Sequence, residues 1–272
     1  MEISRSVAVV TGASSGIGRS VAAELAGRRA TVVVVARRER ELEETAELCR
    51  RSSPDSFAVV ADVADRVDSE KVGMAVHERL GRADILVNNA GISMHKDIRQ
   101  TSVDDVQRVL GVNFLGAVNM MAQFLPGMLE RGRGSIVNVG SVAGQVPTPK
   151  EVAYGAAKAA LHYWTHGLAV DLHGTGVHVG LLSPGPIATE IWAKDETPSS
   201  YRGRMYPPEV VAAGLVRMVE KELVHLTVPR RYGAVGPLYT IPLVQRAIRW
   251  GLVRFEEAGQ RRAAGGSDGT PS

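Results

Sequence analysis

The segment VAYGAAKAALHYW, residues 152–164, contains a tyrosine and a lysine four positions apart, Tyr154 and Lys158. The surrounding alanines favour a helix, and residues four apart on a helix are neighbours on one face. An adjacent ammonium group favours the phenolate and so lowers the pKa of a tyrosine from its usual value of about 10. Such a tyrosine can exchange a proton near neutral pH. The pair is also common without any function, so its meaning depends on the rest of the chain.

Short apolar runs alternate with helical stretches along the chain. Helices are predicted at 17–30, in RERELEETAELCRR, between the third and fourth apolar runs, at 103–131 and around Tyr154. The runs predicted as strands are SVAVVTG (6–12), TVVVVA (31–36), SFAVVAD (56–62), DILVNNAG (84–91), GSIVNVGS (134–141) and VHVGLLSPG (177–185). Continuous apolar strands that alternate with helices predict one α/β domain, with a doubly wound, Rossmann-type parallel sheet covered by helices on both faces.

The composition is that of an ordinary globular protein, with 44% hydrophobic and 22% charged residues in a chain of 272. The net charge of +3 is too weak to indicate a nucleic-acid partner. The single cysteine, Cys49, excludes an internal disulfide, and its helical context is typical of a small buried hydrophobic residue. No signal-peptide layout and no apolar run of about 18 residues is present. We therefore expect a cytoplasmic location.

The first predicted strand ends in TGASSGIG, residues 11–18, immediately before a predicted helix. Parallel sheets bind ligands beyond the carboxyl ends of their strands. Glycines at 12, 16 and 18 allow a tight turn and a close approach of the backbone to a pyrophosphate, and the helix N-terminus supplies N–H donors. In this position the loop indicates a dinucleotide.

The second predicted strand ends in VVVVARRER, which bears on the choice of dinucleotide. Folds that prefer NAD usually place a carboxylate there to accept both ribose hydroxyls. Here the position is Ala36, which leaves room for a 2′-phosphate, and the next residue is Arg37, whose guanidinium can pair with phosphate oxygens. We therefore predict NADP(H) as the cofactor. Arg38 either adds to this phosphate contact or is a solvated charge at a helix start, and the second interpretation is favoured.

Six motifs, in order and at matching spacing, resemble those of the classical short-chain dehydrogenases/reductases over about residues 5–190. They are TGASSGIG, NNAG (88–91), Asn113 in VNFLG, Ser141, Tyr154 with Lys158, and PGPIAT (184–189). The resemblance implies an oxidoreductase that interconverts a carbonyl and a secondary alcohol, on a small substrate that can be hydrophobic. The alternative is a dinucleotide-binding sensor or scaffold without turnover, which loss of Ser141, Tyr154 or Lys158 would have favoured.

The resemblance also implies a role for each matching residue. Tyr154 would be the general acid/base, Lys158 would hold the nicotinamide ribose and lower the tyrosine pKa, Ser141 would hydrogen-bond the substrate oxygen, and Asn113 would hold a water in a proton relay. Substrate contacts are expected from Ser141, Tyr154, Ile191, Trp192 and Tyr206, the last three within a lid at 190–208. Together with Arg37, the implied cofactor contacts are Gly12, Ser14, Ser15, Gly16, Ile17, Gly18, Asp62, Val63, Asn88, Asn89, Ala90, Gly91, Tyr154, Lys158, Pro184, Gly185, Ile187 and Thr189.

The chain departs from the family pattern in two places. Gly140 stands where the family often has a first serine. We expect this difference to cause little loss of catalytic function, because Ser141 stands at the catalytic spacing. The end that packs tetramers in many members is replaced by HLTVPRRYGAVGPLYTIPLVQRAIRWGLVRF, so a homodimer is expected instead. His162 and His166 are four apart on a helix, but no third ligand is evident, and we predict no metal site.

A C-terminal segment forms the last predicted element. One helical face carries Val244, Ala247, Ile248, Gly251, Leu252 and Phe255, with Arg246, Arg249 and Arg254 off this stripe. Such a helix can pack on protein, or lie weakly on a membrane through 243–255, which would make the location membrane-peripheral. We therefore divide the chain into a catalytic domain (1–237), an amphipathic extension (238–260) and a disordered tail (261–272).

Overall fold

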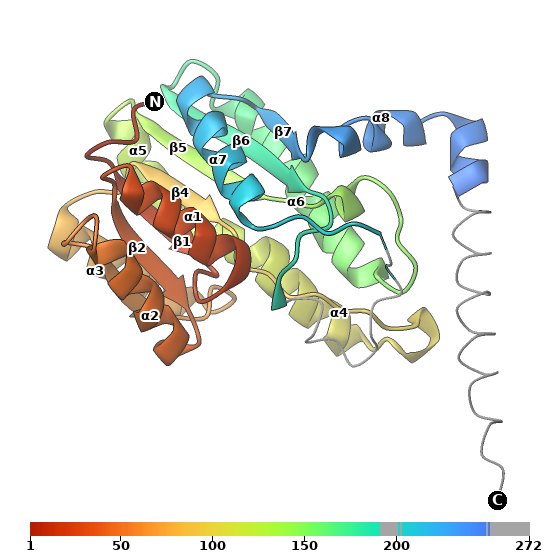
Figure 1. The fold of residues 1–272 in the computed structure, drawn as a ribbon, viewed down its shortest axis with the longest axis horizontal. Coiled ribbons are helices and arrows are strands. Elements are labelled where there is room, and N and C mark those ends of the chain that lie inside the picture. Colours follow the sequence, from red (N-terminus) through yellow and green to blue (C-terminus); the bar gives the residue numbers. More distant parts are fainter. Residues whose placement is uncertain (191–200, 202, 249, 251–272) are drawn as a thin grey trace, which may run out of the picture.

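The computed structural model describes residues 1–190, 201, 203–248 and 250. Within them, seven parallel strands form one sheet in the order β3-β2-β1-β4-β5-β6-β7 (Figure 1). The strands are β1 (Val7–Thr11), β2 (Thr31–Ala36), β3 (Phe57–Val60), β4 (Ile85–Asn88), β5 (Gly134–Val139), β6 (Val177–Pro184) and β7 (His225–Val228). The order reverses at β1, which pairs with both β2 and β4. This switch point is where such a sheet binds ligands, and the predicted fold class is confirmed.

Helices cover both faces of the sheet, which explains why its central strands are continuously apolar. On one face lie α1 (Gly16–Gly27), α2 (Glu39–Arg50) and α7 (Glu209–Lys221), packed through Leu25, Leu42 and Leu215. On the other, α3 (Arg66–Leu80) and α5 (Gly116–Glu130) pack through Val72 and Met120. The remaining long helix, α6 (Val152–Asp171), packs against β6. Short 3₁₀ turns occur at η1 (Ile98–Gln100), η3 (Val142–Gly144) and η5 (Arg230–Tyr232).

The helix predicted at 103–131 is continuous but not regular. It begins at α4 (Val103–Leu110) with a capping box, in which Ser102 Oγ accepts from the Asp105 amide at 3.1 Å and the Asp105 carboxylate accepts from the Ser102 amide at 3.1 Å. A π-helical turn, η2 (Gly111–Leu115), joins it to α5. Val109 of α4 packs against α6, whereas α5 packs against the sheet. Val103–Glu130 is long and apolar enough to cross a membrane by length and composition alone, but part of its apolar surface belongs to the core of this domain.

Two elements between the sixth predicted strand and the C-terminal segment were not predicted. Helix α7 places Val211, Leu215 and Met218 in the core. Strand β7 comes from the HLTV of the segment that departs from the family, and it pairs in parallel with β6. Cys49 is fully buried, and burial raises the pKa of its thiol to about 11, which confirms its role as a packing residue.

The C-terminal segment leaves the body of the domain as an arm (Figure 1). It begins with α8 (Val235–Tyr239), which spans the predicted boundary between residues 237 and 238, and residues 242–248 are again helical. The predicted tail at 261–272 lies outside the described residues.

Candidate active site

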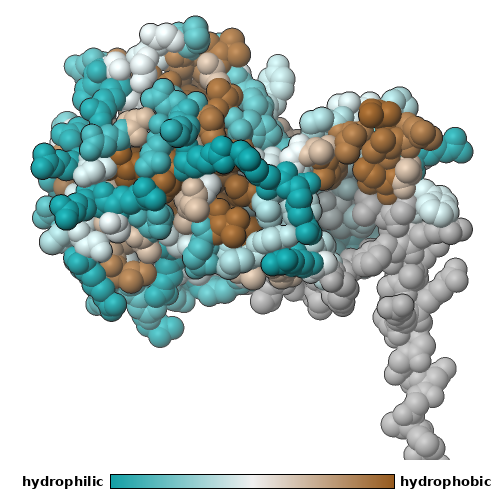
Figure 2. All heavy atoms as spheres, turned by 45° about the horizontal axis from the view of Figure 1, so that its top comes forward, coloured by the Kyte–Doolittle hydropathy of each residue, from teal (hydrophilic) through white to brown (hydrophobic). Residues whose placement is uncertain are grey.

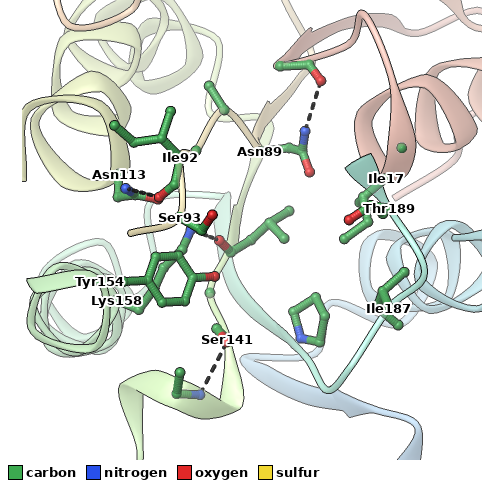
Figure 3. Close-up of a pocket in the computed structure, with 18 of the residues that line it drawn as sticks. Ile17, Asn89, Ile92, Ser93, Asn113, Ser141, Tyr154, Lys158, Ile187 and Thr189 are labelled. Atoms are coloured by element: carbon green, nitrogen blue, oxygen red, sulfur yellow. Dashed lines mark hydrogen bonds between the residues drawn. The ribbon is translucent and has the colours of Figure 1, made fainter. Parts of the chain in front are cut away.

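A cavity of about 1150 Å³ opens at the carboxyl ends of the central strands. Its wall includes Gly12 after β1, Arg37 after β2, Asn89 after β4, Ser141 after β5 and Gly185 after β6. Side chains from the strand ends and from α6 converge on this space (Figure 3). The parallel arrangement brings together residues that are far apart in the chain.

The glycine-rich loop is fixed against the end of β4. Gly12 has a φ of +66°, and a β-carbon there would lie 2.7 Å from Cα of Ala90, so only glycine fits. Asn89 Nδ2 donates to the Thr11 carbonyl oxygen at 2.9 Å, and the amides of Asn89 and Ala90 both donate to Thr11 Oγ1 at 3.0 Å. No side chain caps the N-terminus of α1 at Gly16, which borders the cavity. This helix end is therefore suited to an anion.

Lys158 is a buried cation, only 4% exposed, in the cavity wall. Its Nζ donates to the Val139 carbonyl oxygen at 2.9 Å and lies 5.8 Å from the centroid of the Tyr154 ring. Burial lowers the pKa of Lys158 to about 8, because desolvation disfavours the charged form. The ammonium form nevertheless predominates at neutral pH. The predicted neighbourhood of phenol and ammonium on α6 is present, and both residues line the cavity (Figure 3).

Ser141 lies after the end of β5 and directly before the turn η3. Its Oγ accepts a hydrogen bond from the Ala143 amide at 3.1 Å, which caps that turn. The hydroxyl proton is not used in this bond, so it can be donated to an oxygen atom in the cavity. Because Ser141 and Tyr154 line the same cavity, one substrate oxygen could meet both hydroxyl groups.

Asn113 lies in the π-helical turn η2 and is 1% exposed. Its Nδ2 donates to the carbonyl oxygens of Ile92 (2.9 Å) and Val109 (3.0 Å), which fixes the amide orientation. Its Oδ1 is buried without a hydrogen-bond partner in the described structure. A β-carbon at Gly91 would lie 2.7 Å from that oxygen and 3.6 Å from Lys158 Nζ, so glycine keeps the space between them open. A water molecule there would satisfy the buried acceptor.

The two arginines that follow β2 occupy different positions. Arg37 is 61% exposed and pairs with Asp62, with 3.2 Å between Nη1 and Oδ2. Arg38 is 35% exposed; its Nη2 donates to Ser14 Oγ (3.1 Å) and Ser15 Oγ (2.7 Å). Its Nη1 pairs with Glu190 at 3.1 Å. The interpretation of Arg38 as a merely solvated charge is therefore wrong, because it holds the glycine-rich loop.

Most of the predicted site residues line this cavity. They are Gly12, Ser14, Ser15, Gly16, Ile17, Arg37, Asp62, Val63, Asn89, Ala90, Gly91, Asn113, Ser141, Tyr154, Lys158, Pro184, Gly185, Ile187 and Thr189. Among the described residues, two predicted cofactor contacts do not. A β-carbon at Gly18 would lie 2.3 Å from the Gly12 carbonyl oxygen, so this glycine serves loop packing. Asn88 points into the core, where its Nδ2 donates to Asn138 Oδ1 at 2.8 Å.

The substrate wall differs from the prediction. Tyr206 does not line the cavity: its backbone bonds to Pro186 and Ala188, and its ring lies beside Arg204 and Arg231. Ile191 and Trp192 lie outside the described residues. The wall has several members that sequence reasoning missed, many of them apolar. They include Val142, Val146, Pro147, Pro149, Tyr201, Tyr232, Val235 and Ile248.

A histidine cluster behind Ser141 was also missed. His162 Nε2 lies 3.5 Å from the Ser141 amide nitrogen and 3.4 Å from Ser183 Oγ, which is 3.1 Å from His225 Nε2. Burial, and secondarily the neighbouring His225, lower the pKa of His162 to about 4. His166 stacks edge-on against His225. The part of the chain that the structure describes holds no group of three or more His, Cys, Asp or Glu side chains suited to a metal ion.

Comparison with known proteins places this geometry in context. A family model described as short chain dehydrogenase matches residues 6–199. An uncharacterized oxidoreductase of Staphylococcus saprophyticus is 35% identical over 230 residues, which cover 83% of this chain and 96% of that protein. A short chain dehydrogenase/reductase from Burkholderia phymatum in complex with NAD has a TM-score of 0.82 and 26% identity, over 88% of this chain and 94% of its own. A short-chain dehydrogenase from Sphingobium yanoikuyae in complex with NADPH has a TM-score of 0.78 and 25% identity, over 98% of this chain and 97% of its own.

Proposed function

The chain belongs to the short chain dehydrogenase family of oxidoreductases, and from this premise we propose that it interconverts a carbonyl and a secondary alcohol with NADP(H). The observation that carries the proposal is the meeting of Ser141, Tyr154 and Lys158 in one cavity that also reaches the uncapped N-terminus of α1. A proton-exchanging group and a dinucleotide site in one cavity are the two requirements of this chemistry.

The residues around the cavity fit a nicotinamide dinucleotide. A pyrophosphate would meet the N-terminus of α1, because that end lacks a side-chain cap and is bordered by glycine. Asp62 and Val63 would contact the adenine, and Ile187 and Thr189 the carboxamide, as the family resemblance implies. Lys158 would hold the ribose hydroxyls with the N–H donors that its single bond to Val139 leaves available. When bound, the nicotinamide supplies or accepts the hydride.

The proton would be handled by side chains of this chain. In the direction of reduction, Ser141 Oγ donates a hydrogen bond to the carbonyl oxygen and stabilises its developing negative charge. Tyr154 gives its phenolic proton to the same oxygen, and the Lys158 ammonium stabilises the phenolate that remains. A water held at Asn113 Oδ1, beside Lys158, would return a proton to the tyrosine. The buried Asn113 Oδ1, which has no hydrogen-bond partner in the described structure, supports this relay.

Preference for NADP(H) is supported by the charge around the end of β2. Ala36 provides no carboxylate to repel a 2′-phosphate, and Arg37 and Arg38 both lie on the cavity wall. Their present partners, Asp62 and Glu190, form exposed pairs, which are worth only about 0–1 kcal/mol and can be exchanged. Hydrogen bonds to charged groups contribute about 1.5–3 kcal/mol, so a phosphate would compete well for the Arg37 guanidinium and for Nη1 of Arg38, while Nη2 of Arg38 keeps its bonds to Ser14 and Ser15.

The apolar wall supports a hydrophobic substrate. Val142, Val146, Tyr232 and Ile248 offer little to pair with a charged group. The test is a panel of ketones and secondary alcohols of increasing size and hydrophobicity, with NADPH, NADH and their oxidised forms, followed by absorbance of the reduced nicotinamide. We expect turnover with NADP(H) that improves with apolar size. A chain that binds NADPH but turns over no member of the panel would instead favour the sensor or scaffold.

We also propose a homodimer. Helix α6 exposes Tyr163 and Val170, at 85% and 74%, and their spacing of seven puts them on one helical face. Leu115 and Leu129, near the two ends of α5, are exposed as well. A second copy would bury these side chains. Replacing Tyr163 and Val170 by glutamate should convert the dimer into a monomer by light scattering, whereas a mass that does not change would reject this interface.

A further inference from the structure

The C-terminal arm, residues 235–250 as far as the structure describes them, extends from the body of the domain (Figure 1). Several of its large hydrophobic side chains are exposed. Leu238 is 48% exposed, Ile241 45%, Leu243 76% and Trp250 60%. Figure 2 shows the hydrophobic residues of this extension gathered on its surface. Such a patch usually marks a binding surface for protein or membrane.

The two sides of the arm have different surroundings. Val244 and Ile248, members of the predicted apolar stripe, are only partly exposed, and Ile248 also lines the cavity. Leu243, Arg246 and Trp250 follow one another at i, i+3 and i+7 and therefore share another side of the helix. Val244 and Ile248 are thus partly covered, whereas Ala247 of the same stripe is exposed, and the exposure of Leu243 and Trp250 on the other side needs a different explanation.

The charge of this region decides between candidate partners. From Leu223 to Phe255 the sequence contains no Asp or Glu and five arginines, at positions 230, 231, 246, 249 and 254. Two copies of such a segment would repel each other, so the charge argues against the arm pairing with itself. An anionic lipid surface attracts the arginines and accepts the leucine and tryptophan side chains at the level of its headgroups.

We propose that the C-terminal arm docks the protein on an anionic membrane surface through Leu238, Ile241, Leu243, Arg246 and Trp250. Apolar burial and the attraction of arginine to anionic headgroups act together on such a helix. Val235 and Ile248 belong to the arm and also line the cavity. Docking would therefore bring the apolar end of the cavity close to the lipid, a route for a hydrophobic substrate if the proposed function holds. The docking itself does not depend on turnover.

The test is co-sedimentation of the full chain with vesicles of phosphatidylcholine alone, and of phosphatidylcholine with about one-third phosphatidylglycerol. The key variant is Leu243→Glu/Arg246→Glu. Its matched control is Val67→Glu/Arg66→Glu on α3, which replaces an exposed apolar residue and an exposed arginine and changes the net charge equally. Retained cofactor binding by both variants verifies that they are folded.

We expect the wild type to bind the phosphatidylglycerol vesicles more tightly than the neutral ones, and added salt to weaken this binding. The Leu243/Arg246 variant should bind roughly tenfold or more weakly, while the control variant binds like the wild type. Equal binding by wild type and arm variant would overturn the proposal, as would a wild type that binds neither vesicle. Loss of a solution dimer in the arm variant, without vesicle binding by the wild type, would instead identify a self-association surface.

Discussion

The imidazole of His162 occupies the space that a side chain at position 140 would need: a β-carbon at Gly140 would lie 2.6 Å from His162 Nε2. The departure from the family's serine at this position is therefore matched by a histidine on α6. Because the same Nε2 faces the Ser141 amide at 3.5 Å, His162 lies directly behind the serine that we propose to bind the substrate oxygen.

Replacing Gly140 by serine should consequently disturb the site. The added atoms would meet His162 and the Leu181 side chain, and overpacking of this kind costs about 1–3 kcal/mol. We expect a corresponding loss in the free energy of unfolding and a fall in kcat, both largely restored in Gly140→Ser/His162→Ala. Gly27→Ser is the control, since a β-carbon there meets nothing within 4 Å. If Gly140→Ser were no more costly than the control, the steric argument would fail.

The lowered pKa of His162 predicts a stability that depends on pH. In the folded protein its pKa is about 4, against 6.5 for an unperturbed histidine. Between these values the unfolded chain binds a proton that the folded protein does not, so stability falls as pH decreases from 6.5 towards 4. The shift corresponds to a loss of roughly 3 kcal/mol in the free energy of unfolding over this pH range. Urea unfolding across this range should show a weaker pH dependence for His162→Leu. If the free energy of unfolding changed with pH in the same way for wild type and variant, His162 would not be buried in its neutral form.

Tyr154→Phe removes the exchangeable proton and keeps the ring. Positioned acid–base groups contribute about 10²–10⁴ in rate, so kcat should fall by that factor on a substrate found in the panel. The dissociation constant for NADPH should change little. The control is Tyr163→Phe on the same helix, whose side chain is exposed and outside the cavity. Turnover near the wild-type value would show that another group supplies the proton.

The two arginines after β2 predict separable effects on cofactor choice. Arg37→Ala should weaken NADPH binding about ten- to hundredfold and leave NADH binding nearly unchanged, because NADH lacks the 2′-phosphate that Arg37 would bind. Ala36→Asp/Arg37→Ala should shift the preference towards NADH. Arg38→Ala should weaken both cofactors, since Arg38 also fixes Ser14 and Ser15 of the loop. Titrations followed by nicotinamide fluorescence measure the affinities of these three variants for both cofactors, with Arg40→Ala as an exposed control. Equal affinity of the wild type for NADH and NADPH would reject the preference.

Most of the fold could be predicted from local patterns in the sequence. The run at 31–36 coincides with β2 because a continuous β-branched segment buried on both faces has few alternative structures. The tyrosine–lysine pair could be placed because helical periodicity alone makes the two residues neighbours. Strand β7 is short and contains His225 and Thr227, so its four residues lack the continuous apolar character that identified the other strands.

The missed features of the site depend on contacts between distant segments. Arg38 reaches Ser14 and Ser15 only because β1 and β2 are adjacent, and a charged residue at a helix start carries no local sign of that contact. His225 joins His162 because β7 pairs with β6, which could not be anticipated without placing β7. Tyr206 turns away from the cavity because its backbone pairs with the segment around Ile187, a pairing set by tertiary structure.

The π-helical turn at Gly111–Leu115 sets the rotational phase of the helix that follows it. Successive residues of an α-helix are separated by about 100° around its axis. Loss of one residue from this turn would rotate the side chains of α5 by about that angle relative to α4. Met120, Phe124 and Met128 would then point away from the sheet while Val109 still faced α6. The length of the segment around Asn113 is therefore constrained by packing as well as by chemistry.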